Sequence, residues 1–453
     1  AAVIKLELKT KGAAKLAQVP LDRLRFFLKG EDQTTFALHE LLLNSTLRVV
    51  VEAGGQSVTL GRPAIRPVGF EKEDALLPYD ARSFLGYRLL QEYFAFPWKF
   101  LFIDFDTAGF RVANKDATSL TISIHLEPFE RPERLAELER DVTAETFRLG
   151  CTPAVNLFSR LSEPITLSHA VPEYWLNPDQ HNQLTTEIYS VDRVVAKAAL
   201  GSETRVFQPF YSVRHGESEE GAFWYAARRP TLRKGFRQKD QGTDVFLSFV
   251  DLRFRPNAPA GDVVHAELTC TNRDLASGLR KQVYGAWGAF HTDAAAGVRI
   301  RGLVAPTDTL RPPMGGARQW RLISHLALNH LSLTEGLDPL KEMLSLYEFA
   351  GQAAGPLSVR SQLHGLTGLS ARRVMERIAS DMGVVFCQGL ALDLEIDETP
   401  FAGAGSYVFL CVLERFFALY ASMNSFTQLT VRSRQRREAF RRWNPRAGDQ
   451  ILL

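Results

Sequence analysis

The sequence has 453 residues, of which 45% are hydrophobic and 23% are charged, and its 32 glycines and 22 prolines follow no period. This much apolar surface can offset the chain entropy lost on folding, so these values exclude a mainly disordered chain as well as collagen-like and coiled-coil proteins. The formal net charge of +3 is too small for a protein whose main task is to coat nucleic acid.

Residues 1–105 form the first predicted region, which is β-rich and ends in an aromatic helix–strand motif. Residues 1–70 contain short apolar and β-branched runs separated by turn residues, a pattern typical of strands. From Arg82 to Phe94 the polar side chains recur on one helical face and the apolar ones cover the rest. Pro97 ends this predicted helix, and the apolar run over residues 99–105 then predicts a buried strand.

Residues 106–319 form the second predicted region, which is dominated by strands. Short apolar runs such as residues 119–126 and 244–254 alternate with turns that contain glycine, proline and asparagine. This spacing predicts one or two β-sandwich-like units.

Residues 320–453 form the third predicted region, an α+β C-terminal domain. Asp338 and Pro339 predict a helix start, with an N-cap followed by proline at the first helical position. The fold class expected for the whole chain is therefore α+β and multidomain, with a β-rich, sandwich-like middle. Within the third region the predicted helices cover residues 320–333, 340–350 and 406–423, and the predicted strands cover residues 390–396 and 426–431.

The cysteines and the apolar runs indicate the compartment. The four cysteines, Cys151, Cys270, Cys387 and Cys411, are too far apart for a CxxC motif, and so few in a long chain favour a reducing compartment. The strongly apolar run over residues 407–413 is about a third of the ~20 residues that a membrane helix needs. The N-terminus alternates apolar and charged residues, unlike a secretion signal. We expect a soluble, cytoplasmic chain without direct membrane insertion.

A search for catalytic motifs is mostly negative. The sequence has no GxxxxGK[ST] loop, no complete dinucleotide fingerprint, no GxSxG and no HExxH. Asp104 and Asp106 form a DxD pair that could hold a divalent cation at a strand end, although a strand emerging into solvent explains the same pattern. We expect no catalytic residue, no cofactor and no metal, and we keep a metal-assisted hydrolase using Asp104 and Asp106 as an alternative.

The strongest charge feature is an arginine-rich tail with Trp443 among its arginines. Arginine beside an aromatic residue suits phosphates and stacked bases, an acidic protein neighbour, or solvent alone. Because the whole chain carries only +3 and Glu438 interrupts the run, we expect contact with protein or solvent and no nucleic acid. An RNA-binding protein is the alternative. The arginines of the tail are Arg432, Arg434, Arg436, Arg437, Arg441, Arg442 and Arg446.

One long segment carries a family resemblance. Residues 79–105, YDARSFLGYRLLQEYFAFPWKFLFIDF, resemble the TssF family, also called ImpG or VasA, a baseplate subunit of the bacterial type VI secretion system. Further segments agree with this family in the same order, so the resemblance spans nearly the whole chain. These segments are residues 66–70, 151–158, 223–230, 268–275, 320–333, 346–347, 412–429 and 443–448.

The resemblance implies a structural role without catalysis. Two TssF-like copies and one TssG-like subunit would form a wedge, and wedges would gather with TssK-like and TssE-like subunits around a VgrG-type spike. That assembly would support the contractile sheath and effector delivery, in the bacterial cytoplasm at a baseplate docked to the inner-membrane complex. The abundance of phenylalanine, with 30 residues, fits extensive protein–protein contact.

The sequence departs from the family pattern at two places. Family members usually open with a tyrosine- and arginine-rich helical segment that contains a DPxVERL-like stretch. The sequence opens instead inside a predicted strand, so we expect the chain to lack this N-terminal portion. In the FPxKF element Trp98 stands where the family usually has an acidic residue. An exposed Trp98 would alter a contact surface, whereas a buried one would only repack it.

Ten residues are candidates for a partner interface or for a buried framework. The aromatic helix–strand motif is predicted to be buried framework. Phe416 and Phe417 are predicted to face a partner in part, with packing inside the domain as the alternative. The arginines of the tail would pair with carboxylates of a neighbour. The candidates are Phe84, Tyr87, Phe94, Phe96, Trp98, Phe416, Phe417, Arg436, Arg437 and Trp443.

Overall fold

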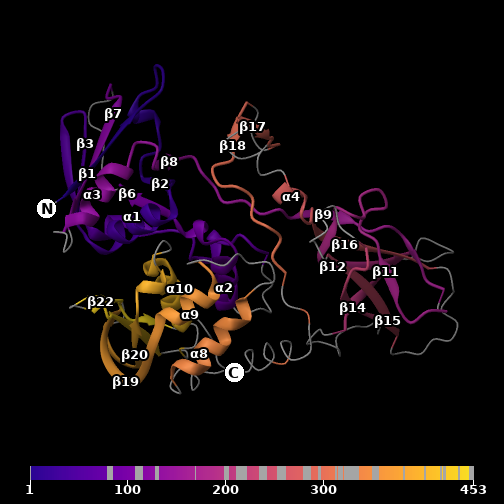
Figure 1. The fold of residues 1–453 in the computed structure, drawn as a ribbon. Coiled ribbons are helices and arrows are strands. Elements are labelled where there is room, and N and C mark those ends of the chain that lie inside the picture. Colours follow the sequence, from indigo (N-terminus) through magenta and orange to yellow (C-terminus); the bar gives the residue numbers. More distant parts are fainter. Residues whose placement is uncertain are drawn as a thin grey trace. The chain divides into compact units, whose positions relative to one another are not determined.

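The structure, a computed structural model, groups the chain into two compact units (Figure 1). Unit 1 combines residues 1–154 with residues 315–453, and unit 2 is the continuous segment 155–314. The three consecutive regions expected from the sequence stay a prediction, and the described residues of the first and third regions belong to one unit. The described residues are 2–78, 85–107, 116–127, 132–168, 170–197, 204–210, 222–233, 242–251, 262–278, 287–293, 297–311, 314, 320, 336–348, 357–380, 383–401, 405–418, 421, 425–436 and 439–447.

Unit 1 contains an antiparallel sheet in the order β1 (Val3–Lys9), β7 (Ser119–Leu126), β3 (Thr46–Ala53) and β4 (Gln56–Gly61). Along β7 every second residue is buried, because one face of the sheet covers the core and the other faces outward. Gly54 and Gly55 have positive φ angles of 57° and 84° and form the turn between β3 and β4, at the place where the sequence predicts a turn.

A second sheet of unit 1 has the order β5 (Ile65–Pro67), β6 (Phe102–Asp106), β2 (Arg23–Leu28) and β8 (Phe147–Leu149). β6 is buried along most of its length, as its apolar run predicts. It begins later than the predicted start at residue 99, because Pro97–Phe100 form a 3-10 turn. Proline at the first position of this turn has a fixed φ that suits it and lacks the N–H that a strand needs.

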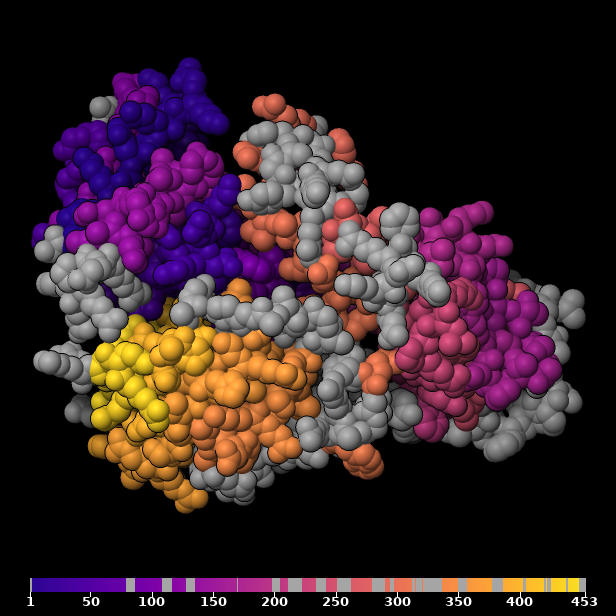
Figure 2. Space-filling model, viewed as in Figure 1, coloured from indigo at the N-terminus to yellow at the C-terminus, as the bar shows by residue number. Residues whose placement is uncertain are grey.

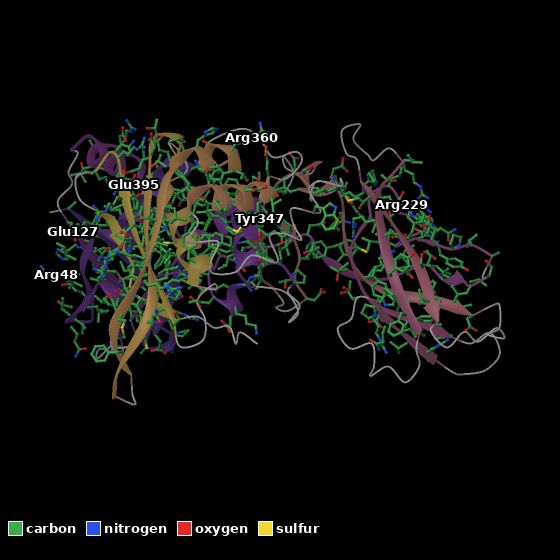
Figure 3. The ribbon with its side chains drawn as sticks, turned by 90° about the horizontal axis from the view of Figure 1, so that it is seen from below. Arg48, Glu127, Arg229, Tyr347, Arg360 and Glu395 are labelled. Carbon is green, nitrogen blue, oxygen red and sulfur yellow. The ribbon has the colours of Figure 1, made fainter. Side chains whose placement is uncertain are left out.

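The third sheet of unit 1 has the order β19 (Leu366–Ser380), β20 (Gly383–Ile396), β21 (Phe426–Ser433) and β22 (Ala439–Arg442), with β23 (Arg446–Ala447) also paired to β21. β21 pairs with β20 only along residues 389–396. The β19–β20 hairpin therefore extends past the other described strands of this sheet as a two-stranded ribbon (Figure 3). Met375 and Phe386 lie on this ribbon and are 71% and 68% exposed.

Helix α10 (Ser406–Ala418) lies at the centre of unit 1. All of its residues except Arg415 are buried, so the helix is enclosed on every side. It packs against α2 (Leu85–Ala95), α1 (Asp32–Asn44) and β21. The indigo N-terminal and the yellow C-terminal residues accordingly lie against each other in Figure 2. The core of unit 1 thus joins parts of the chain that are far apart in the sequence.

Two helices correct the sequence-based prediction. α1 lies within residues 1–70, where only strands and turns were expected, and α3 (Pro132–Asp141) lies in the region expected to be dominated by strands. α3 begins with proline at a position that suits a first helical turn, and its remaining residues are mostly good helix formers. α3 therefore forms where its local sequence favours a helix, inside a stretch whose average composition favours strands.

The helix predicted over residues 340–350 is present but lies nearer the N-terminus and is shorter, and a second helix that was not predicted follows it. α8 (Leu337–Leu344) has Gly336 at its N-cap, so the helix starts before Asp338 instead of being capped by it. Asp338 then lies in the first turn, where its negative charge favours the helix dipole. α9 (Val359–Gly365) follows, with Ser358 as its N-cap. The predicted helix over residues 320–333 lies outside the described residues, apart from Trp320.

Unit 2 is sandwich-like, in agreement with the predicted fold of the middle of the chain. Strands β12 and β16 on one side and β14 and β15 on the other enclose one apolar core, to which Val264, Ala266 and Leu247 contribute. Strands β13 and β14 pair in parallel and join the two halves of the sheet. The strands are β9 (Phe158–Leu161), β10 (Ile165–Thr166), β11 (Tyr174–Leu176), β12 (Glu187–Lys197), β13 (Thr204–Pro209), β14 (Ala222–Pro230), β15 (Thr243–Asp251) and β16 (Val263–Thr271).

In the described part of unit 2, three further elements follow β16. A short helix α4 (Leu275–Gly278) follows the strand directly. Strands β17 (Trp287–Phe290) and β18 (Ile300–Arg301) then form a separate two-stranded sheet. The described residues of this unit after β18 are 302–311 and 314.

Candidate functional site

An aromatic cluster joins α2 to α10 and to the segment that follows α8. Tyr93 stacks on Phe409, with ring centroids 5.6 Å apart, and Phe94 lies 6.1 Å from the same ring. Phe94 also stacks on Tyr347, labelled in Figure 3, at 5.9 Å. Phe94 is only 3% exposed, so its ring fills the interior of unit 1. Paired aromatic rings of this kind add to the energy of apolar burial, which makes the cluster a rigid framework.

The C-terminal aromatic candidates also lie in the interior. Phe416 and Phe417 on α10 are fully buried, which favours the alternative that they pack inside the domain. Tyr87 on α2 lies 6.5 Å from Phe416, so the two helices share these rings. Phe84 lies outside the described residues.

Trp98 and Phe96 lie at the edge of the framework and are half-buried. Their rings are 5.4 Å apart. The indole Nε1 of Trp98 donates a hydrogen bond to Oδ1 of Asp32 at 2.7 Å. Asp32 is the first residue of α1, so Trp98 connects the 3-10 turn to the start of that helix. A half-buried, hydrogen-bonded Trp98 lies between the two alternatives expected from the sequence.

A buried ion pair lies beside this framework. Lys99 and Glu92 are each 1% exposed, and Lys99 Nζ donates a hydrogen bond to Glu92 Oε2. Glu92 Oε1 accepts hydrogen bonds from the backbone N–H groups of Leu76 and Leu77, both at 2.8 Å. Burial lowers the pKa of Lys99, although the charge of Glu92 and its hydrogen bond act in the opposite direction. The satisfied carboxylate therefore holds the segment before α2 against the helix.

Arg436 of the tail pairs with carboxylates of its own chain. Its guanidinium donates to Glu398 Oε1 at 2.7 Å and Oε2 at 2.8 Å, and to Glu40 Oε1 of α1 at 2.8 Å. It also lies 4.0 Å from the ring centroid of Phe440. Burial acts to lower the pKa of Arg436, but Glu398 and Glu40 outweigh it and raise the pKa. The partner carboxylates expected from a neighbouring protein are thus supplied within unit 1, while Arg437 lies outside the described residues.

Other arginines of the tail dock the same segment onto α1 and α10. Arg441 Nη1 donates to the carbonyl oxygen of Leu43 at 2.9 Å and to the hydroxyl of Tyr407 at 2.6 Å. Trp443 is 8% exposed and stacks on Tyr407, with ring centroids 6.2 Å apart. Arg446 Nε donates to the buried carboxylate of Glu414 at 2.6 Å. Most described arginines of the tail therefore bind other parts of unit 1 and hold the tail against α1 and α10.

Three tail arginines are more accessible. Arg442, which is 62% exposed, donates to Glu376 at 3.3 Å and to Gln428 at 2.8 Å. Arg432 and Arg434 are exposed. Among the described arginines of the tail, these three are the ones exposed to solvent.

The candidate cation pair, Asp104 and Asp106, pairs with arginine. Arg25 donates to both oxygens of Asp104, at 2.7 and 2.9 Å, and Arg66 donates to Asp106 at 2.6 Å. Asp104 is only 6% exposed, and the two arginines neutralise the charges that would attract a metal. Among the described residues no three histidine, cysteine or acidic side chains come together as a metal site. The DxD pattern is explained by ion pairs across the second sheet.

His39 of α1 is a buried titratable group that the sequence analysis did not single out. It is 0% exposed, and within the described part of the chain neither ring nitrogen has a hydrogen-bond partner. Its ring lies 6.0 Å from that of Tyr407. Burial lowers the pKa of His39 to about 3, so the imidazole is neutral at physiological pH.

Comparison with known proteins identifies the family. The sequence matches the family described as "Type VI secretion system, TssF" over residues 1–450. The chain belongs to the TssF family. The type VI secretion system component TssF1 of Pseudomonas aeruginosa is 33% identical over 465 residues, a match that covers 99% of this chain and 73% of that protein. The family resemblance of residues 79–105 and of the segments that agree with it is confirmed.

Two solved structures that share this fold are type VI baseplate complexes. A chain of the TssK–TssF–TssG baseplate subcomplex matches with a TM-score of 0.75 and 24% identity, over 100% of this chain and 79% of that chain. A chain of the baseplate complex from the type VI secretion system matches with a TM-score of 0.60 and 21% identity, over 97% and 72%. TssF is a baseplate component, and the α+β, multidomain fold class predicted from the sequence is confirmed.

The segment that carries the strongest resemblance, residues 79–105, packs against the central helix α10 through α2. Its described residues include α2, Trp98 and β6, and they contain the aromatic cluster and the Glu92–Lys99 pair. None of the helices in the described ranges combines the length and the apolar character required to span a bilayer.

Several structurally important charges were missed in the sequence. Lys99 stands alone within an aromatic, apolar run, and such an isolated charge signals a buried, paired group. Glu92 belongs to the polar face of the predicted helix, so its burial was not expected from the sequence. Glu40 and His39 went unnoticed because α1 itself was not predicted. No sequence signal indicates that Glu40 meets Arg436, because these residues are 396 positions apart.

Proposed function

We propose that the chain is a structural subunit of the type VI secretion baseplate and that it acts through protein contacts without catalysis. The observation that carries this proposal is the TssF family match over residues 1–450. The likeness of its fold to TssF in a TssK–TssF–TssG baseplate subcomplex supports TssK-like and TssG-like subunits as its partners. The arginine pairs of Asp104 and Asp106 speak against the hydrolase alternative.

The finer arrangement is part of the same proposal. Two copies of the chain would join one TssG-like subunit in a wedge, and wedges would assemble with TssK-like and TssE-like subunits around a VgrG-type spike. The wedge would act in the bacterial cytoplasm, at a baseplate docked to the inner-membrane complex. The exposed Met375 and Phe386 of the β19–β20 ribbon support a role in contacts, because exposed apolar side chains that lie close together often mark a protein interface.

Co-expression with TssG-like and TssK-like subunits tests the proposal. A tag on this chain should recover both subunits, and sedimentation of the complex should give two copies of this chain for each TssG-like subunit. A ratio of one to one would overturn the asymmetric wedge. Recovery of neither subunit, from a chain whose folding is verified separately, would overturn the baseplate role itself. Fractionation of cells should place the complex with the membrane fraction only while the inner-membrane complex is present.

The accessible arginines of the tail provide a sharper test of a partner contact. We propose that Arg432 and Arg434 face carboxylates of a partner subunit, because the described residues hold Arg436, Arg441 and Arg446 inside unit 1. The double variant Arg432→Glu with Arg434→Glu should lower recovery of the TssG-like subunit without changing the melting temperature. If recovery is unchanged, these arginines form a solvated face.

The same tail allows a test against RNA binding. We expect short single-stranded RNA to bind the chain weakly at ~0.15 M salt, because most tail arginines already have partners within the chain. Sub-micromolar affinity that falls steeply with added salt would overturn this expectation, since such a slope reports counterions displaced from phosphates.

A further inference from the structure

The corner that follows β16 in unit 2 has an unusual backbone. Arg273 has a φ of 51°, and it is the one residue other than glycine with positive φ in the described part of the chain. Arg273 and the adjacent Asp274 are 5% and 7% exposed. The turn is closed by the N–H of Leu275, which donates to the carbonyl oxygen of Asn272 at 3.0 Å. A strained residue in a buried turn persists only where its surroundings over-determine the conformation.

The segment by which the chain enters unit 2 is bound to this corner. Asn156 is the second residue of the unit and is exposed. Its Nδ2 donates to Oδ1 of Asn272 at 3.0 Å, and the backbone N–H of Asn272 donates to its Oδ1 at 2.7 Å. Two reciprocal hydrogen bonds therefore hold the incoming chain at the corner before β9 pairs with β16.

The segment by which the chain leaves unit 2 is bound to the same corner. Thr309 Oγ1 donates to the carbonyl oxygen of Arg273 at 2.6 Å. Two residues later, Arg311 donates to both oxygens of Glu187, with Nη2 at 2.5 Å from Oε2. Glu187 is 7% exposed, so this pair is largely shielded from solvent. The outgoing chain thus has one neutral and one charged attachment.

The sandwich supports the corner from behind. Arg273 Nη1 donates to the carbonyl oxygen of Leu184 at 3.2 Å, and its guanidinium lies so close to Gly242 that a Cβ there would be 2.1 Å from Nη2. Glu187 also accepts from the N–H of Thr243 at 2.9 Å, next to Gly242. Burial acts to raise the pKa of Glu187, but Arg311 and Thr243 outweigh it and lower the pKa. The ends of β12, β15 and β16 therefore meet at this corner.

We propose that residues 271–274 are a clasp that holds both chain connections of unit 2 at one place. A body attached through two separate points can turn only by straining its connections. A body whose connections are fastened together can turn about one pivot as a rigid whole, which is the geometry of a hinge. The clasp gives unit 2 such a pivot and keeps the sandwich itself unchanged as the unit turns.

Hydrogen exchange of the full chain, without any partner, tests the clasp. Asn156→Ala removes the two bonds of the incoming segment from an exposed position, so it leaves the core intact. We expect it to raise exchange of the Asn272 amide, which loses its acceptor, at least tenfold, and exchange of the Thr243 amide, which is bonded to Glu187, severalfold through the shared corner. Arg311→Met should produce the reverse pattern, with the larger effect on the Thr243 amide. Exchange of the other amides of β12, β15 and β16 should stay at the parent level in both.

A matched control and a second variant keep the test decisive. Arg193→Met removes an exposed ion pair with Glu267 between β12 and β16, and it should change neither connection. If Arg311→Met fails to fold, Thr309→Val removes the neutral attachment alone and should likewise raise exchange of the Thr243 amide. The clasp is refuted if each variant changes only the amide at its own attachment, or if exchange rises through the whole sandwich. Both results are independent of the baseplate assembly proposed above.

Discussion

Replacing Arg436 by methionine tests whether the arginine tail stabilises unit 1. The substitution removes two hydrogen bonds to Glu398 and one to Glu40, and it leaves Glu40, which is 7% exposed, without its arginine. Removing one partner of a buried ion pair costs about 3–5 kcal/mol. Solvent screens part of this interaction, because the side chains of Arg436 and Glu398 are 22% and 24% exposed. We therefore expect a loss of about 2–4 kcal/mol.

Hydrogen exchange of the α1 amides measures this loss locally, without assuming that the two units unfold together. A loss of 2–4 kcal/mol corresponds to roughly 30- to 1000-fold faster exchange, since about 1.4 kcal/mol is a factor of ten. Arg434→Met is the matched control, because Arg434 lies on the same tail but is exposed, and it should leave α1 unchanged. Adding Glu40→Gln to Arg436→Met should restore part of the protection, because the carboxylate charge is then gone. Exchange within threefold of the parent in Arg436→Met, or an equal effect of Arg434→Met, would refute the reasoning.

Three further sets of substitutions test unit 1. Phe94→Ala should lower the free energy of unfolding by about 3–5 kcal/mol through lost burial and a cavity. Phe96→Ala should lower it by clearly less, because Phe96 is only half-buried. Equal shifts of the urea midpoint would contradict the assignment of Phe94 to the framework. The pKa of His39 in the folded chain, about 3, lies below its ordinary value of 6.5, so the unfolded chain binds the proton first as pH falls. The free energy of unfolding should therefore fall as the pH falls from about 6.5 toward 3, by about 2 kcal/mol at pH 5. His39→Leu should abolish this part of the pH dependence of urea unfolding. An unchanged pH dependence would show that His39 titrates normally. Asp104→Asn with Asp106→Asn should leave partner recovery unaltered, and Mg²⁺ should not shift the melting temperature of the parent chain; a metal bound by both carboxylates would disprove the ion-pair explanation.

Elements with one clear local signal could be predicted from the sequence. The alternation in residues 119–126, the paired glycines after β3 and the apolar run of β6 each correspond to an observed strand or turn. α1 could not be recognised in the same way, because FALHELLL is apolar on most faces and a short apolar run does not distinguish a helix from a strand by its period. Its helical state depends on the burial that α10 provides.

The residues of the aromatic motif were predictable and their charged partners were not. Phe94 belongs to a periodic helix, so its burial follows from its neighbours in the sequence. The contact of Arg436 with Glu40 depends on how three sheets and α10 bring distant segments together, and charge patterning along the chain contains no information on that distance. The same reason explains why a solvated face and a protein interface both remained open for the tail, with nucleic-acid binding as the less expected alternative.

The pairing of N-terminal with C-terminal residues in unit 1 has a consequence for folding during synthesis. Glu40 and Arg436 are 396 residues apart, so at ~5–20 residues per second a ribosome needs roughly 20–80 s to pass from one to the other. Unit 2 is continuous in sequence and has all of its strands available well before that time. Until α10 and the tail emerge, α1 lacks its contacts with them, which include His39 against Tyr407 and Phe36 against Gly405. The nascent N-terminal part is therefore the stretch of this chain with the longest need for a holding chaperone.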